Sequence, residues 1–520
     1  MRFLPLLGFL LLSSLYAAPP IEATVPPPVH DTFSHIAPNA LKGHVSFLAS
    51  DLLEGRNTPS PGLDIAAEYI AAQFRRAGLE TIPGSSSYFQ IAPWTYKQIP
   101  LDGVKLQVRN GDNTIELDAT HLSINTLEPV NLHNAPIFIA RLDDTAKLKE
   151  QPENSLEGKV VLAFTPSRAA IFRLPREERS DRMRAASDLY SALRRLKPAF
   201  ILAIRDDSER GAGATGQLID PSRPPSGRRG GGFFQPSAVH SAKLAAMLTP
   251  LASGQTEAQL TLQVPEPIER PAPLKNVIGI LPGSDPQLKN TYVLVTAHYD
   301  HIGTATPVDG DGIYNGANDD ASGTASVIEL ASTFAALPQR PKRTIIFMTV
   351  FGEEKGLLGA FYYARHPVFP LAQTVANINL EHMGRTDDSE GPQINRLSPT
   401  GYAFSEVIDY FQLAGKLTGV EIVNNKENSE PFFARSDNQA FANSGVPAHT
   451  FCVAFEFPDY HGLGDHWEKI DYDNMARINR TVATAVWMIA DRHEAPEWHT
   501  LSQTDKYREA RKKEGNKSGQ

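Results

Sequence analysis

Three apolar runs in the second half of the chain each end beside ionisable side chains. Histidine or carboxylate side chains closely follow each run: His298 and Asp300 after residues 291–297, Glu353 and Glu354 after 343–351, and Glu381 after 375–380. Apolar runs of this length, rich in Val, Ile and Phe, predict buried strands. Because ligand sites of an open, mostly parallel sheet form outside the carboxyl ends of its strands, the pattern predicts one site at one sheet edge.

Apolar residues recur at helical spacing between these runs and near the N-terminus. The segment from Leu63 to Phe74 predicts a helix that ends at Gly78. From Asn276 onward strands and helices alternate, which is typical of an α/β layer with a largely parallel sheet. We therefore predict an α/β domain with a mixed, mostly parallel central sheet flanked by helices, divided in the sequence between residues 36–99 and 273–495.

The region between these two parts, residues 100–272, has a different pattern. Short apolar runs alternate there with polar turns, which predicts the strands of a β-rich inserted domain with one helical segment. The four prolines between Pro265 and Pro273 predict an extended linker at its exit.

Both ends of the chain depart from a globular pattern. One positive charge precedes an apolar run that ends near Ala18, which has the form of a secretory signal peptide and falls short of the ~20 residues of a membrane span. We expect residues 1–18 to be a signal peptide and the protein to be exported to the periplasm or the extracellular space, without stable membrane insertion. Residues 496–520 are polar and basic without periodicity, so we expect a disordered tail.

Composition limits the partners and the metal ligands. A chain of 520 residues is too long for one core, so at least two domains are expected. The net charge of −9 argues against nucleic acid as a partner. The single cysteine, Cys452, excludes an internal disulfide and a zinc site built from cysteines.

Two pairs of adjacent carboxylates are hard to explain by folding alone. Asp319 and Asp320 precede a helical stretch, where helix capping accounts for one of them. Glu353 and Glu354 stand together at a strand end, where like charges repel and burial disfavours both, and a nearby cation would remove that cost. Two zinc ions that share one carboxylate, ~3.5–4 Å apart, need a set of this kind. The remaining members are His298, Glu381 and a late histidine, His461.

The motifs around these residues resemble peptidase family M28, a family of di-zinc aminopeptidases. They read Thr296-Ala-His-Tyr-Asp-His-Ile-Gly303, Gly316-Ala-Asn-Asp-Asp-Ala-Ser-Gly323, Phe351-Gly-Glu-Glu-Lys-Gly-Leu-Leu-Gly359, Asn379-Leu-Glu-His-Met-Gly-Arg385 and Asp459-Tyr-His-Gly-Leu-Gly-Asp465. Residues 100–272, notably 158–162, are similar to the protease-associated (PA) domain inserted in such enzymes. The resemblance implies a phosphorylase/hydrolase-like zinc exopeptidase fold.

The same resemblance implies a role for each member of the set. Five metal ligands are implied: His298 and Glu381 for one zinc ion, Glu354 and His461 for the other, and Asp319 as the bridge. Glu353 would act as the general base, and Tyr460 would stabilise the oxyanion. Two further carboxylates would orient the ligands: Asp300 and Asp465.

The chain departs from the family pattern at two positions. Glu381 stands where many members carry aspartate, and Asn438 stands where a Ser-Asp-His motif has its histidine. Two further histidines, His301 and His382, adjoin implied site residues, and we expect them to be neighbours of the ligands rather than ligands.

These observations predict a zinc exopeptidase that removes N-terminal residues from peptides with a free amine. A carboxypeptidase or a glutaminyl cyclase on the same scaffold is the alternative. A carboxypeptidase would need a cation to hold the substrate carboxylate, and Arg385 and Arg435 lie near the motifs. The motifs indicate no particular oligomeric state.

Overall fold

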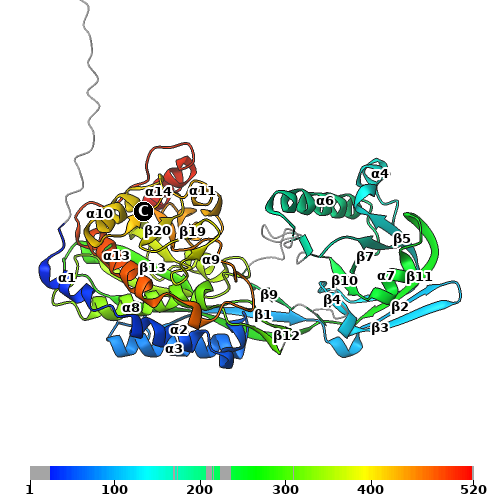
Figure 1. Ribbon diagram of the computed structural model, residues 1–520, viewed down its shortest axis with the longest axis horizontal. Coiled ribbons are helices and arrows are strands. Elements are labelled where there is room, and N and C mark those ends of the chain that lie inside the picture. Colours follow the sequence, from blue (N-terminus) through cyan, green and yellow to red (C-terminus); the bar gives the residue numbers. More distant parts are fainter. Residues whose placement is uncertain are drawn as a thin grey trace, which may run out of the picture. The chain divides into compact units, whose positions relative to one another are not determined.

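The computed structural model describes residues 24–167, 170–171, 174–205, 213–214, 216–222, 236–308 and 310–517, so the predicted signal peptide lies outside the described residues. The chain forms two compact units, each of which Figure 1 shows by its labelled elements. Residues 1–90, 276–304 and 313–520 belong to the first unit, and residues 91–275 and 305–312 to the second. Among the described residues, no helix combines the length and the apolar character needed to cross a membrane.

The first unit is built on a mixed sheet with β13 near its centre. Its strands follow the order β21 (Glu421–Ile422), β20 (Arg396–Pro399), β22 (Ala448–Cys452), β17 (Thr374–Leu380), β13 (Tyr292–His298), β16 (Thr344–Val350) and β12 (Ile268–Leu281). β13 runs parallel to both of its neighbours, and β17 runs parallel to β22. β12 pairs antiparallel with β16, and β20 pairs antiparallel with β22. The predicted mixed, mostly parallel sheet is therefore confirmed. All residues of β13, β16 and β17 are buried, which explains why these strands are mostly apolar and carry no acidic residue.

Helices flank this sheet, as predicted. They are α1 (Pro27–Ser34), α2 (Pro38–Leu48), α3 (Pro61–Ala77), α8 (Gly323–Ala335), α9 (Leu358–Arg365), α10 (Glu406–Thr418), α11 (Ser429–Phe432), α12 (Asn438–Ala442), α13 (Tyr472–Asp491) and α14 (Asp505–Lys517). The predicted helix around 63–74 is α3, and it ends at Gly78 in the left-handed conformation, with φ of 77°.

The helices divide between the two faces of the sheet. α8 and α13 contact β13, and Phe334 of α8 packs against Phe347 of β16. Successive strand residues point to opposite faces, so Met348 points the other way. It belongs to a core cluster with Tyr363 of α9 and Phe441 of α12. The core therefore encloses the sheet on both sides and leaves the strand ends available for a site.

The second unit contains a separate nine-stranded sheet. Its strands follow the order β3 (Asn113–Asp118), β2 (Lys105–Asn110), β11 (Gly254–Val264), β5 (Val130–Arg141), β6 (Val160–Phe164), β7 (Phe200–Arg205), β10 (Ser237–His240), β4 (Leu122–Ile124) and β8 (Gly213–Ala214). Three helices accompany it: α4 (Thr145–Glu150), α6 (Arg176–Arg195) and α7 (Ala242–Leu248). In the same unit, β1 (Phe89–Gln98) pairs antiparallel with β9 (Gln217–Ile219).

The predicted linker at residues 265–273 differs from the structure. Most of it lies in β12, which begins at Ile268 and includes Pro271 and Pro273. The ladder of β12 with β16 begins only at Val277. Both prolines therefore precede that ladder, where their missing N–H groups interrupt none of its hydrogen bonds.

The prediction of a disordered tail over 496–520 is wrong for the residues that the structure describes there. Trp498 is 7% exposed and Tyr507 is 3% exposed, and their rings stack with centroids 5.1 Å apart. The indole N–H of Trp498 donates to the carbonyl of Gly445 at 2.9 Å, and α14 follows. Two widely spaced aromatic residues thus anchor a segment whose composition is otherwise basic.

A buried arginine holds the N-terminal segment against the strand ends. Arg56 is 1% exposed, and its guanidinium donates to the carbonyls of Tyr299 at 2.9 Å, Asn315 at 2.7 Å and Gly316 at 2.9 Å, and also to the carbonyl of Leu48. Burial lowers the pKa of Arg56 to about 10, against the opposing effect of nearby aspartates. The side chain therefore stays charged at neutral pH and ties three segments of the first unit together.

We predict that Arg56→Met destabilises the protein by ~3 kcal/mol or more, because several buried carbonyls lose their donor at once. The measurement is the free energy of unfolding in urea. Arg76→Met, at an exposed arginine in the last turn of α3, is the matched control and should change that free energy by less than ~0.5 kcal/mol. Equal stability of the two variants would show that Arg56 does not organise the fold.

Candidate metal centre

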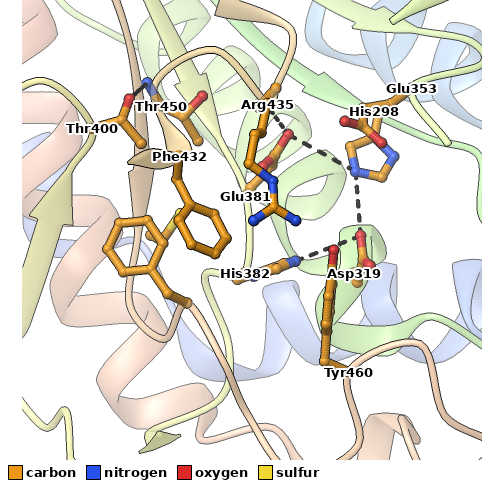
Figure 2. Close-up of a pocket in the computed structure, with 13 residues that line it drawn as sticks. His298, Asp319, Glu353, Glu381, His382, Thr400, Phe432, Arg435, Thr450 and Tyr460 are labelled. Carbon is orange, nitrogen blue, oxygen red and sulfur yellow. Dashed lines mark hydrogen bonds and ion pairs between the residues drawn. The ribbon is translucent and has the colours of Figure 1, made fainter. Parts of the chain in front are cut away.

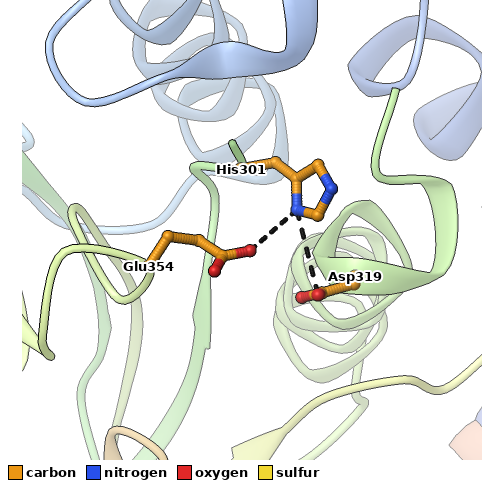
Figure 3. Close-up of side chains that lie close together, drawn as sticks. All are labelled: His301, Asp319 and Glu354. Atoms are coloured by element: carbon orange, nitrogen blue, oxygen red, sulfur yellow. Dashed lines mark ion pairs between the residues drawn. The ribbon is translucent and has the colours of Figure 1, made fainter. Parts of the chain in front are cut away.

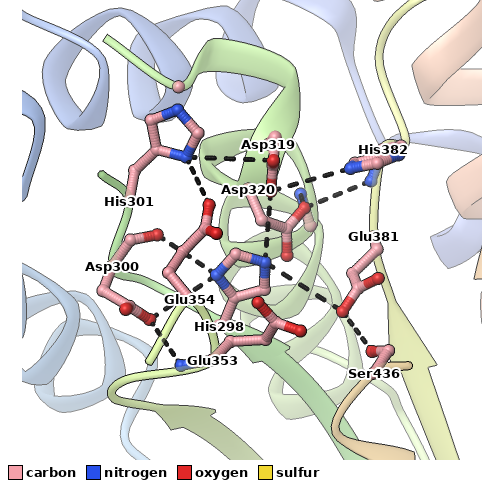
Figure 4. A network of polar contacts seen from close by, with 12 residues as sticks. His298, Asp300, His301, Asp319, Asp320, Glu353, Glu354, Glu381, His382 and Ser436 are labelled. Carbon is pink, nitrogen blue, oxygen red and sulfur yellow. Dashed lines mark hydrogen bonds and ion pairs between the residues drawn. The ribbon is translucent and has the colours of Figure 1, made fainter. Parts of the chain in front are cut away.

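Three strand ends bring the predicted site residues together. His298 is the last residue of β13, and the register places it beside Val350 at the end of β16. Glu353 and Glu354 follow the end of β16, and Glu381 directly follows β17, which pairs with the other side of β13. The side chains therefore meet at the carboxyl edge of the sheet, as Figure 4 shows.

Asp319 comes from the loop that precedes α8. The loop begins at Gly316, which has φ of 61°, and a Cβ atom at this position would collide with the ring of His301. The buried carboxylate of Asp465 accepts the backbone N–H groups of Asn318 at 3.0 Å and of Asp319 at 3.1 Å. Asp465 therefore fixes the backbone that presents Asp319.

The carboxylate of Asp319 lies between two groups of nitrogen atoms. Its Oδ1 is 3.3 Å from Nε2 of His298 and 3.6 Å from Nε2 of His382, as the dashed lines in Figure 2 mark. Its Oδ2 is 3.1 Å from Nε2 of His461 and 3.9 Å from Nδ1 of His301. One carboxylate with a donor group on each side is the arrangement that two cations with a shared ligand require.

The two predicted glutamate ligands each join one of these groups. Oε2 of Glu354 is 3.2 Å from Nε2 of His461, and Oε1 of Glu381 is 4.0 Å from Nε2 of His298. The hydroxyl of Ser436 donates to Oε1 of Glu381 and orients it. The structure thus brings together all five residues for which the sequence predicted metal binding, as two pairs around Asp319.

His301, which the sequence predicted to be only a neighbour, lies inside the second group. Its Nδ1 is 2.9 Å from Oε1 of Glu354 (Figure 3). His301, Asp319 and Glu354 each offer an atom within 4.8 Å of the others, a cluster able to hold a metal ion. Sequence reasoning thus did not foresee that His301 and His382 both face Asp319. The available signal was that each directly follows a predicted site residue.

Asp300 contacts two parts of the site. Nδ1 of His298 lies 3.1 Å from the backbone oxygen of Asp300 and 3.6 Å from its Oδ1. The same Oδ1 accepts the backbone N–H of Glu353 at 3.1 Å, and Oδ2 accepts the hydroxyl of Thr58 at 3.0 Å. One buried carboxylate therefore sets the positions of His298 and of the turn after β16.

Burial raises the pKa values of the site carboxylates, whereas contacts with histidines lower them. Burial alone would raise the pKa of Asp319, but hydrogen bonds from three histidines hold that pKa well below its usual value. Burial raises the pKa of Glu353 well above its usual value, and the nearby charges of Glu381 and Glu354 raise it further. Burial therefore favours the protonated form of Glu353, as it does for Asp320, whose pKa is also raised well above its usual value.

Several buried polar atoms test whether a cation suits this site. Within the described part of the chain, Oδ2 of Asp320 and Nε2 of His301 are buried without a hydrogen-bond partner, and Nδ1 of His301 has only the ion-pair contact with Oε1 of Glu354. Imidazole nitrogens and carboxylate oxygens are the donors of a zinc site without cysteine. The residues present therefore fit zinc.

Tyr460 lies at the open side of the centre. Its ring stacks on the ring of His461 with centroids 4.2 Å apart, and the residue is 38% exposed. Burial of the hydroxyl end and the carboxylates of Asp319 and Glu354 raise the pKa of Tyr460 well above its usual value. The hydroxyl is therefore a hydrogen-bond donor at neutral pH.

Comparison with known proteins agrees with this geometry. Residues 276–486 match peptidase family M28. A probable zinc metalloprotease of Pyrenophora teres f. teres is 35% identical over 245 residues, which cover 44% of this chain and 50% of that protein. This chain thus spans about half the length of the curated relatives it matches.

Solved structures share the fold over most of the chain. An aminopeptidase from Aneurinibacillus sp. strain AM-1 covers 90% of this chain, with 97% of its own chain aligned, 20% identity and a TM-score of 0.56. A zinc aminopeptidase from Bacillus subtilis covers 88% of this chain, with 96% of its own chain aligned, 18% identity and a TM-score of 0.53. At these identities the likeness concerns the fold.

The comparisons correct the predicted location in the periplasm or extracellular space. Two relatives are vacuolar membrane proteases, from Phaeosphaeria nodorum and Coccidioides posadasii. The first is 37% identical over 97 residues, which cover 19% of this chain and 9% of that protein. The apolar N-terminal run that suggested export is therefore not a guide to where the protein resides.

The family match covers all the predicted metal-binding residues, the shared carboxylate included. It also covers most of the strands of the first unit's mixed sheet. Over residues 276–486 the chain is therefore similar to peptidase family M28.

Proposed function

We propose that this protein is a zinc aminopeptidase that hydrolyses the N-terminal peptide bond of peptides with a free amine, using two zinc ions. One observation carries the proposal. Asp319 lies between two groups of donor atoms, while Glu353 lines the same pocket and makes no ion pair with a histidine among the described residues. A shared carboxylate beside a free one is what a two-ion hydrolase needs.

Each side chain then has a definite part in holding the ions. One ion would be held by His298 and Glu381, the other by Glu354 and His461, and both by Asp319. When bound, two zinc ions supply Lewis-acid chemistry that polarises a carbonyl and makes water more acidic. Asp300 and Asp465 support this set by fixing His298 and the backbone of Asp319.

Glu353 transfers the proton in this proposal. Its backbone N–H is fixed by Asp300, so its carboxylate keeps its place at the pocket wall. A raised pKa in the metal-free protein suits a group that accepts a proton from the attacking water and then gives it to the leaving amine. The neighbouring Glu354 is engaged with His461 and His301, so the two adjacent glutamates have different tasks.

Tyr460 is suited to stabilise the negative oxygen that develops in the reaction. Its hydroxyl stays protonated at neutral pH and lies at the same pocket as Asp319 and Glu353. A donor that faces the developing charge lowers the barrier more than one that contacts only the substrate.

The proposed function is tested by assaying aminoacyl-arylamides before and after removal of zinc with a chelator. We expect hydrolysis that disappears on chelation, returns with zinc, and requires two ions per chain. N-acetylated arylamides should resist hydrolysis, because the free amine is part of the recognised group. Full activity in metal-free protein would refute the proposal, as would release of ammonia from N-terminal glutamine without any peptide hydrolysis.

We predict that Glu353→Gln keeps its zinc but loses turnover by ~10²–10⁴-fold, because glutamine is close to isosteric and cannot accept the proton. Zinc content and kcat are measured on the same preparation. Normal zinc content with nearly normal kcat would assign the proton transfer to another group.

We predict that Asp319→Ala lowers zinc content as well as activity, because both donor groups lose their shared carboxylate. Zinc per chain is measured after dialysis against a weak chelator. The control is Asp112→Ala, at an exposed aspartate in the turn between β2 and β3, which should retain zinc and activity. A zinc-replete Asp319→Ala variant would contradict the bridging role.

A further inference from the structure

One arginine extends into the pocket beside the metal centre. As far as the structure describes the chain, the pocket lining includes Arg435 and neither a second arginine nor a lysine. Figure 2 shows its guanidinium between Phe432 and Tyr460, above His382. Glu353 and Glu381 line the same pocket, so the guanidinium of Arg435 lies at the site of the proposed reaction.

The side chain of Arg435 is held in place by a contact that leaves its N–H donors unused. The guanidinium lies over the ring of Phe432, 4.2 Å from the ring centroid, and the backbone N–H donates to the carbonyl of Phe432 at 3.0 Å. The next residue, Ser436, donates its hydroxyl to Glu381. The arginine is therefore anchored on one side to an aromatic ring and on the other to a proposed zinc ligand.

The donors of Arg435 remain available. Within the described residues its guanidinium forms no ion pair and no hydrogen bond, and the residue is exposed. Arg385, the other arginine near the motifs, is different, because it is 3% exposed and pairs with Asp387 and with Asp459, the latter at 2.9 Å. Of the two arginines that the carboxypeptidase alternative raised, only Arg435 is free to bind a ligand.

A purely structural role for Arg435 would be to offset the negative charge of the carboxylates in the metal centre. On the proposed function, however, two zinc ions would offset four negative charges, as many as Asp319, Glu353, Glu354 and Glu381 carry. Arg435 also forms no ion pair with any of these carboxylates. With zinc bound, its charge is left for a group that enters the pocket from solvent.

We propose that Arg435 binds a carboxylate of the substrate, so that the pocket selects peptides that carry a negative charge close to the scissile bond. A guanidinium with several free N–H donors matches a carboxylate by two parallel hydrogen bonds. This inference rests on the proposed function and names its substrate class. The carboxylate has two possible sources: an acidic side chain on the N-terminal residue, or the free C-terminus of a dipeptide.

Two matched substrate pairs distinguish these sources. The first pair is the arylamides of glutamate and glutamine, and the second is the dipeptide Ala-Ala and its C-terminal amide. We expect the charged member of one pair to have a kcat/KM ~10- to 100-fold above the neutral member. The pair that shows the preference identifies the source.

Three variants link that preference to the arginine. Arg435→Met keeps an apolar contact with Phe432 but removes the charge. The ratio of kcat/KM between the charged and the neutral substrate should therefore fall close to one. Arg435→Lys should retain part of the ratio, because it keeps the charge but loses the two-pronged geometry. Arg76→Met is the remote control and should leave the ratio unchanged. Equal zinc content in all variants shows that the centre is intact.

A binding measurement separates this inference from the proposed function. Calorimetry compares glutamate with glutamine, and Ala-Ala with its amide, on the zinc-loaded wild type and on Arg435→Met. Carboxylate-dependent binding that Arg435→Met abolishes would support the inference even if no peptide were hydrolysed, which would refute only the proposed function. Absence of any charge preference, or a preference that survives in Arg435→Met, would overturn the inference while leaving the aminopeptidase proposal in place.

Discussion

Buried negative charge at the carboxyl edge of the central sheet is the constraint on which the rest of the first unit depends. Several buried carboxylates meet there: Asp300, Asp319, Asp320, Glu381 and Asp465. Burying unpaired carboxylates is costly, so each must find donors or a cation. The histidines, the backbone N–H groups around Asn318 and the buried Arg56 supply part of this compensation. A pair of divalent ions would supply the remainder of this compensation. Metal binding would then stabilise the fold as well as serve the reaction.

The sheet makes this concentration of charge possible. β13, β16 and β17 are buried on both faces, and the helices that cover them exclude water up to the strand ends. The carboxylates of the site follow the strand ends, whereas the strands themselves, apart from His298, contain only uncharged polar residues such as Asn377 and Asn379. Arg56 then reaches the turns after the strand ends from the N-terminal segment and binds carbonyls on both sides of the loop that leads to Asp319. The compensation is thus supplied by parts of the chain that are far apart in sequence.

Sequence reasoning succeeded where a local pattern has one physical explanation. Mostly apolar runs that end in acids and histidines predicted the strands and the sheet edge where these side chains meet, because a doubly buried strand has little room for charged groups except at its ends. It did not foresee the role of Arg56, because three of its four carbonyl partners lie more than 240 residues away in the chain. It also did not foresee that His301 and His382 turn toward Asp319, since alternation along a strand does not fix side chains in the turns that follow. The helix α14 was missed because two aromatic residues carry little weight in a basic segment.

The packing of the C-terminal segment has a consequence for the reaction pocket. Trp498 and Tyr507 both contact the ring of Phe433, with centroids 6.4 and 5.6 Å from it, and Phe433 adjoins Phe432 in the pocket wall. Proteolytic trimming or a bulky affinity tag that displaced Trp498 and Tyr507 would therefore disturb this pocket wall. The segment that carries these two residues thus supports the shape of the pocket as well as the fold.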